Sequence, residues 1–99
     1  MKTYTIDELR RIIAPIAQEH GVEKVSLFGS YARLNATAQS DVDLKIEKGA
    51  IRSLFQLCSF RLALEDSLQL SVDVITSGAN DTAFLSQIAQ DEVVLYERA

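Results

Sequence analysis

Residues 25–33 read VSLFGSYAR, an apolar strand that ends at Gly29-Ser30 and runs into a short helical turn. Glycine lets a phosphate approach the backbone closely, and the N-terminus of the following helix offers unpaired N–H donors to an anion. Ser30 adds a hydroxyl donor, and Arg33 is placed to reach a phosphate or an acidic neighbour. Taken alone, however, this turn favours a simpler interpretation, a strand-to-helix connection with a capping serine.

The next strand along the chain, 41–46, reads DVDLKI and alternates strictly between apolar and polar residues. If its apolar members Val42, Leu44 and Ile46 face a core, Asp41 and Asp43 project together from the opposite face, about 7 Å apart. Two carboxylates so placed repel each other and raise each other's pKa. A divalent cation removes that conflict, and ligands that are all oxygen select hard ions such as Mg²⁺.

A third carboxylate, Asp73, lies in a later alternating strand, 70–75, between the core candidates Val72 and Val74. If the two acidic strands are neighbours, Asp73 completes a cluster of three carboxylates. Such a cluster can hold two metal ions, which clamp a phosphoryl centre and lower the pKa of an attacking hydroxyl. The alternative is that these acids are solvated residues on an exposed sheet face.

The rest of the sequence predicts further helices and strands before, between and after these segments. A capping box, Thr5 with Glu8, opens a helix that Gly21 ends, and Pro15 is expected to kink it or end it early. Residues 51–68 form a broad apolar stripe, which suits a helix buried on one side and meeting a partner on another. The other expected elements are a strand at 22–28, a helix capped by Asp81 that carries Phe84, Leu85 and Ile88, and a short strand at 93–96. This order predicts an α/β (α+β) fold, a single mixed β-sheet flanked by helices.

Length and composition limit the class of protein. A chain of 99 residues is expected to form one domain, 1–99. The net charge of −4 and pI near 4.8 argue against direct nucleic-acid binding. No apolar run reaches the ~18 residues of a membrane span, and the first eight residues carry acids where a signal peptide needs apolar ones. The single cysteine, Cys58, fits a reducing cytoplasm.

Together, the Gly-Ser turn, the Asp-x-Asp strand and the third acidic strand resemble the nucleotidyltransferase superfamily that includes DNA polymerase beta. The chain most resembles the minimal nucleotidyltransferases, the MNT antitoxins that accompany HEPN ribonuclease toxins. The resemblance implies that Gly29, Ser30 and Arg33 hold the triphosphate of ATP. It also implies a metal and catalytic set in which Asp41 and Asp43 bind two Mg²⁺ ions, while Asp73 shares one ion and helps to deprotonate the acceptor.

The implied reaction is transfer of AMP from ATP to a hydroxyl group, with tyrosine as the expected acceptor, on a HEPN toxin in a hetero-oligomer. Two alternatives stay open: an inactive protein of the same fold that neutralises its toxin by binding, and an enzyme that modifies a small molecule or an RNA end. The second alternative is disfavoured, because the larger relatives that modify small molecules or RNA carry an additional substrate-binding domain, for which 99 residues are expected to leave no room. One departure is Leu34, which stands where the family usually has glycine. Since leucine does not easily adopt positive φ, we expect the loop after Arg33 to be displaced.

Overall fold

The computed structural model describes residues 3–76 and 91–98. Its elements, in chain order, are α1 (Ile6–Glu19), β1 (Lys24–Phe28), α2 (Gly29–Ala32), β2 (Val42–Glu47), α3 (Leu54–Leu68), β3 (Val72–Thr76) and β4 (Val93–Glu97). The four strands form one sheet in the order β3-β2-β1-β4. Strand β1 is antiparallel to β2 and β4, whereas β2 is parallel to β3. The prediction of a single mixed sheet flanked by helices is confirmed.

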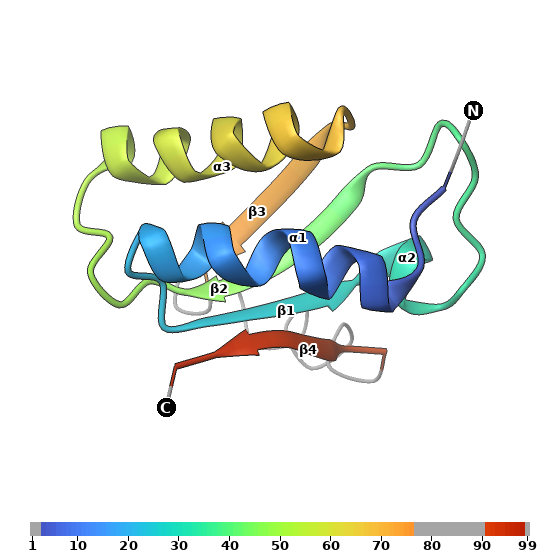
Figure 1. Ribbon diagram of the computed structural model, residues 1–99, viewed down its shortest axis with the longest axis horizontal. Coiled ribbons are helices and arrows are strands. Elements are labelled where there is room, and N and C mark those ends of the chain that lie inside the picture. The colour runs from blue at the N-terminus through green and yellow to red at the C-terminus, as the bar shows by residue number, and fades with distance from the viewer. Residues whose placement is uncertain (1–2, 77–90, 99) are drawn as a thin grey trace.

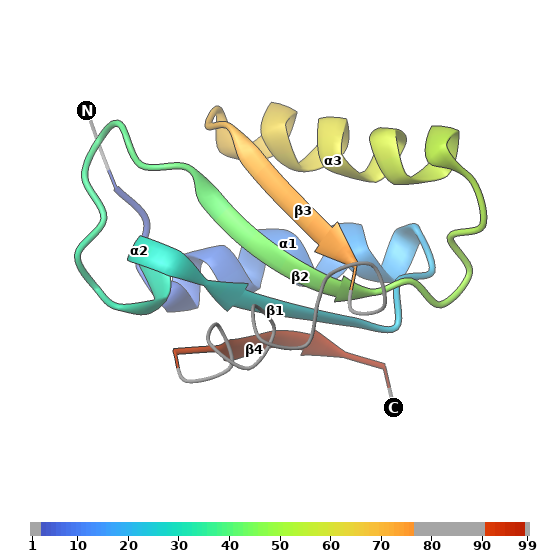
Figure 2. The ribbon, with the colours of Figure 1, turned by 180° about the vertical axis from the view of Figure 1, so that it is seen from behind.

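Helices α1 and α3 lie side by side on one face of this sheet (Figure 1). The parallel pairing of β2 and β3 requires a crossover connection, which α3 provides. Figure 2 looks onto the other face, which is turned away from α1 and α3.

The helix starts follow from side-chain caps. In α1 the Glu8 amide donates to Thr5 Oγ1 at 3.0 Å, and the Thr5 amide donates to Glu8 Oε1 at 2.9 Å, so the predicted capping box is confirmed. The expected early end at Pro15 is wrong, because α1 continues to Glu19. Helix α3 begins at Leu54, later than the apolar stripe indicates, because Ser53 is its N-cap. The helix expected from Asp81 lies outside the described residues.

The core lies between the sheet and the two long helices. Strand β2 alternates as predicted, with Val42, Leu44 and Ile46 fully buried. They pack in one cluster with residues from both helices and the neighbouring strands, among them Leu9, Ile13, Val25, Leu27, Phe60, Leu64 and Val72. The period of two therefore turns the acidic residues of β2 away from the helices. Within the described ranges, no helix is long and apolar enough to span a membrane.

Leu34 adopts a left-handed backbone with φ of +63°, so the expectation that leucine avoids this conformation is wrong. The hydrogen bonds explain it. The Leu34 amide donates to the Tyr31 carbonyl, and the Asn35 amide donates to the Ser30 carbonyl at 3.0 Å. This pair is a Schellman motif, which ends a helix with a residue of positive φ, usually glycine. Leucine carries a steric cost there, but its side chain is 79% exposed and meets no obstacle in the core.

Candidate active site

Two of the three aspartates meet across neighbouring strands. In the parallel pairing of β2 with β3, Asp43 stands directly opposite Asp73, and the two carboxyl groups share a hydrogen bond. Asp41 immediately precedes β2 and is exposed. The condition stated from the sequence, that the two acidic strands are neighbours, is therefore met (Figure 2).

The Gly-Ser turn lies against the same carboxylate. Strand β1 pairs with β2 so that Phe28 stands opposite Asp43, and Gly29 follows at once. A Cβ atom added to Gly29 would lie 2.3 Å from Asp43 Oδ2, and Gly29 has a φ of +75°. Both the conformation and the contact require glycine here. The turn and the acids, which are separate motifs in the sequence, form one site.

The electrostatics of the site centre on Asp43. Partial burial and then, in decreasing order, the charges of Asp73 and Asp41 together raise the pKa of Asp43 to about 6 from an ordinary 3.8. Arg33 opposes them, lowering the pKa of Asp43, while its own guanidinium lies 3.8 Å from Asp91 Oδ2. The sequence expectation that clustered carboxylates raise a pKa is confirmed for Asp43. The expectation that Arg33 reaches an acidic neighbour is confirmed as well.

This donor set fits a hard divalent cation by its chemistry. All three candidate ligands are carboxylates, and their mutual repulsion is the conflict that a bound cation relieves. In residues 3–76 and 91–98, no three acidic, histidine or cysteine side chains are already grouped as a metal cage. The acids therefore form a close pair, Asp43 with Asp73, while Asp41 acts on Asp43 through its charge.

Sequence reasoning missed one polar contact on the same face. Lys45 Nζ lies 2.5 Å from Glu92 Oε1, and both side chains are largely buried. Because β1 separates β2 from β4, this ion pair passes across β1, where Ser26 stands opposite Lys45 and is fully buried. The period of two places Lys45 on the face of Asp43, but no spacing in the sequence identifies Glu92 as its partner.

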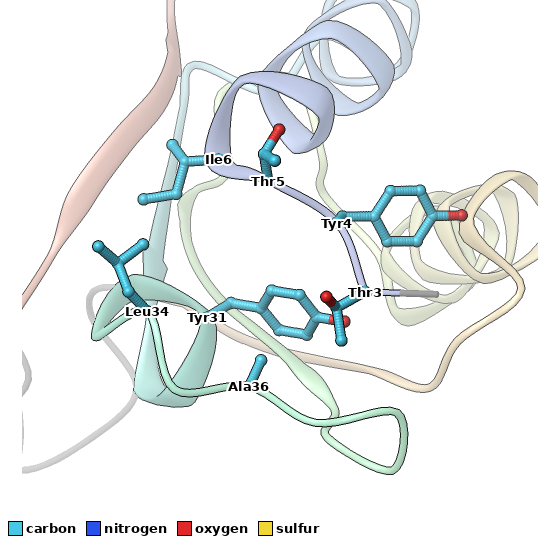
Figure 3. A pocket seen from close by; sticks show the side chains of 7 residues that line it. All are labelled: Thr3, Tyr4, Thr5, Ile6, Tyr31, Leu34 and Ala36. Atoms are coloured by element: carbon cyan, nitrogen blue, oxygen red, sulfur yellow. The ribbon is translucent and has the colours of Figure 1, made fainter. Parts of the chain in front are cut away.

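A cavity of about 220 Å³ lies behind the turn, between the start of α1 and α2 (Figure 3). Its lining residues are Thr3, Tyr4, Thr5, Ile6, Tyr31, Leu34 and Ala36. Tyr31 directly follows Ser30 but is 3% exposed and belongs to the core cluster. None of the three aspartates lines this cavity, so it is distinct from the acidic site.

Comparison with known proteins places these motifs in context. The family model described as polymerase beta, nucleotidyltransferase, matches residues 11–99. A Methanocaldococcus jannaschii protein named as a candidate protein adenylyltransferase is 44% identical over 71 residues, which are 72% of this chain and 76% of the relative. The protein adenylyltransferase MntA of Thermococcus cleftensis is 27% identical over 97 residues, covering 94% of this chain and 98% of the relative.

Solved structures share the fold. One described as a candidate minimal nucleotidyltransferase has a TM-score of 0.79 and 26% identity, over 94% of this chain and 98% of that one. Another contains a tri-AMPylated HEPN toxin of Shewanella oneidensis in complex with an MNT antitoxin. It has a TM-score of 0.72 and 16% identity, over 95% of this chain and 74% of that one.

Proposed function

Because this chain belongs to the polymerase beta nucleotidyltransferase family, we propose that it transfers AMP from ATP to a hydroxyl of a HEPN-type toxin. The modification neutralises the toxin, so the chain acts as an antitoxin in the cytoplasm, in a hetero-oligomer with its target. In this proposal residues 1–99 act as one catalytic domain, and a tyrosine of the toxin is the acceptor.

The observation that carries the proposal is the contact of Gly29 with Asp43, which itself faces Asp73. It brings a turn suited to a phosphate within reach of a carboxylate pair suited to a cation. A solvated acidic face requires no such contact. The raised pKa of Asp43, caused first by its partial burial and then by the charges of Asp73 and Asp41, marks the same place as a candidate functional site.

In this site each residue has a separate role. Gly29 lets the triphosphate approach the backbone, Ser30 donates a hydroxyl hydrogen bond to it, and the Arg33 guanidinium offers it positive charge. Asp41, Asp43 and Asp73 would hold two Mg²⁺ ions, which when bound neutralise the phosphates and lower the pKa of the acceptor hydroxyl. Asp73 is exposed on β3, the outermost strand on that side of the sheet among the described residues, and in this proposal it accepts the proton of the acceptor hydroxyl.

The relatives support the substrate and the partner. Those at 44% and 27% identity are named as protein adenylyltransferases, which favours a protein acceptor over a small molecule or an RNA end. A neighbour in fold was solved as a toxin-antitoxin complex with AMP-PNP, an analogue of ATP. Another was solved with an AMPylated HEPN toxin.

Intact-mass spectrometry of the cognate toxin tests the proposal. After incubation with the chain, ATP and Mg²⁺, the toxin should gain the mass of one or more adenylates and lose its ribonuclease activity. The variants Asp43→Asn and Asp73→Asn should give unmodified toxin, whereas Glu19→Gln, an exposed acid at the end of α1, should behave as the wild type. A toxin that is inhibited without any gain in mass would overturn the proposal in favour of neutralisation by binding.

A further inference from the structure

Helix α3 presents apolar residues to solvent as well as to the core. Its core side carries Phe60, Leu64 and Leu68, all buried. On the outer side Phe55 is 89% exposed, Leu54 67% and Leu62 57%, and the exposed Cys58 lies between them. Large apolar side chains grouped on the exposed side of a helix mark an interaction surface.

The position of α3 leaves this patch accessible. Helix α3 runs along one margin of the molecule, with α1 beside it and β3 beneath it (Figure 1). In the part of the chain that the structure describes, α1 and β3 are the elements that pack closely against α3, and Leu54 at its start also lines a cavity with Lys48 and Thr76. The patch is on the helical side of the sheet, away from the acidic site.

The charges at the two ends of α3 oppose the helix dipole. Arg52 precedes the helix at its N-terminal end, and Asp66 is exposed in its last turn. A cation is unfavourable at a helix N-terminus and an anion at a C-terminus. Neither residue has an ion-pair partner among residues 3–76 and 91–98. A second α3 in antiparallel orientation would make both charges favourable. Its Asp66 would lie near Arg52 and near the N-terminus of the first helix, and its Arg52 would lie near Asp66 and the C-terminus of the first helix.

We propose that α3 pairs with α3 of a second copy of this chain, in an antiparallel arrangement about a two-fold axis between Cys58 and Ser59. In that register Phe55 packs against Leu62 of the second copy, and the reverse contact follows from symmetry. The basic start of each helix then faces the acidic last turn of the other. Since helices pack with their axes about 8–10 Å apart, the two Cys58 side chains lie close together at the centre.

The mass of the pure chain in solution tests this proposal. Sedimentation velocity over a series of protein concentrations should show twice the 11.0 kDa of one chain. Phe55→Glu should raise the dissociation constant by about a hundredfold or more, because a central aromatic contact is lost on both sides of the axis. Leu34→Glu is the matched control, since Leu34 is also exposed but lies outside the patch, and it should leave the dimer intact. Circular dichroism confirms that both variants fold.

Cross-linking tests the register. A short bismaleimide should join two wild-type chains through Cys58 but should not join chains of the Cys58→Ser, Ser67→Cys variant, whose thiol stands elsewhere on the same helix. A monomer at every concentration, a dimer unaffected by Phe55→Glu, or equal cross-linking at both positions would overturn the proposal. A monomer whose Phe55→Glu variant only loses binding to the toxin would assign the patch to the toxin instead. Neither test uses nucleotide, so its outcome is separate from that of the proposed function.

Discussion

At the scale of single residues, position 29 requires glycine for two reasons: its φ is +75°, and the Asp43 carboxylate lies where a Cβ atom would point. Gly29→Ala should cost about 1–2 kcal/mol of stability from the left-handed conformation, and it should displace Asp43. Gly21→Ala is a matched control, because Gly21 has a φ of +73° and a Cβ there would crowd Ala50 instead. Urea unfolding should show losses of similar size for the two variants. Adenylate transfer should fall only in Gly29→Ala, and equal transfer in both would contradict the role given to this contact.

Leu34 stores strain that glycine would release. Leu34→Gly should relieve about 1–2 kcal/mol of left-handed strain, offset by roughly 0.5–1 kcal/mol for the greater freedom of glycine in the unfolded chain. The side chain is mostly exposed, so little burial is lost. The melting temperature should therefore rise by a few degrees, whereas Leu34→Ala, which keeps a Cβ at positive φ, should gain much less. A melting temperature that falls in Leu34→Gly would show that the leucine contributes contacts which outweigh its strain.

Asp43 makes stability depend on pH in a defined direction. Its pKa of about 6 in the folded chain exceeds the ordinary 3.8, so the folded state binds this proton more tightly than the unfolded state does. The resulting stabilisation is complete below pH 3.8 and is lost as the pH rises through about 6. Relative to Asp43→Asn, the wild type should thus become less stable over this interval. The urea midpoints of the two proteins, measured across this pH interval with Glu19→Gln as the control, give the difference in stability. A difference that does not change with pH would contradict the raised pKa of Asp43.

At the scale of elements, the ion pair of Lys45 with Glu92 joins β2 to the start of β4 across β1. Removing one member of a largely buried pair leaves the other charge unpaired, which costs about 3–5 kcal/mol, while replacing both with apolar residues is often neutral. Lys45→Met and Glu92→Leu should each destabilise the chain strongly, and the double variant should recover most of the loss. Chemical unfolding of the four proteins in a double-mutant cycle measures the coupling. Additive losses would mean that the two side chains act independently.

The strands and helices follow from patterns that are local in the sequence, and for that reason they could be predicted. Alternation in 41–46 gives the buried face of β2 and the opposite position of Asp43, and the capping residue Thr5 marks the start of α1. The parallel pairing that sets Asp43 beside Asp73 does not follow from either strand's own pattern, because strand order is a property of the whole chain.

What could not be predicted depends on contacts between distant segments or on backbone detail. The approach of Gly29 to Asp43 arises from the register of β1 on β2. Glu92 is paired with Lys45 only through the strand order. Leu34 adopts positive φ because two hydrogen bonds close a Schellman motif, and the general preference of leucine gave the wrong expectation. The first two are contacts between distant segments, which no local pattern specifies, whereas the third is a local hydrogen-bond pattern that outweighs the conformational preference of leucine.

At the scale of the whole molecule, the two faces of the sheet carry different features. The face covered by α1 and α3 holds the core, and α3 offers its apolar outer side to a second copy. The opposite face carries Asp43 and the ion pair of Lys45 with Glu92. The proposed dimer contact through α3 is therefore separate from the acidic face, where the proposed function places nucleotide and toxin.

In the proposed function, the Gly-Ser turn and the three aspartates form a site for ATP with a divalent cation. Thermal melts of the wild type and of Asp43→Asn, each with EDTA or with saturating MgATP, test this site without any partner protein. A ligand at about 100 times its Kd adds about 2.7 kcal/mol, and each kcal/mol moves Tm by roughly 4–8 °C in a domain of this size. MgATP should raise the Tm of the wild type by about 10 °C or more, and leave that of Asp43→Asn nearly unchanged. Equal shifts in the two proteins, or none in either, would contradict the site.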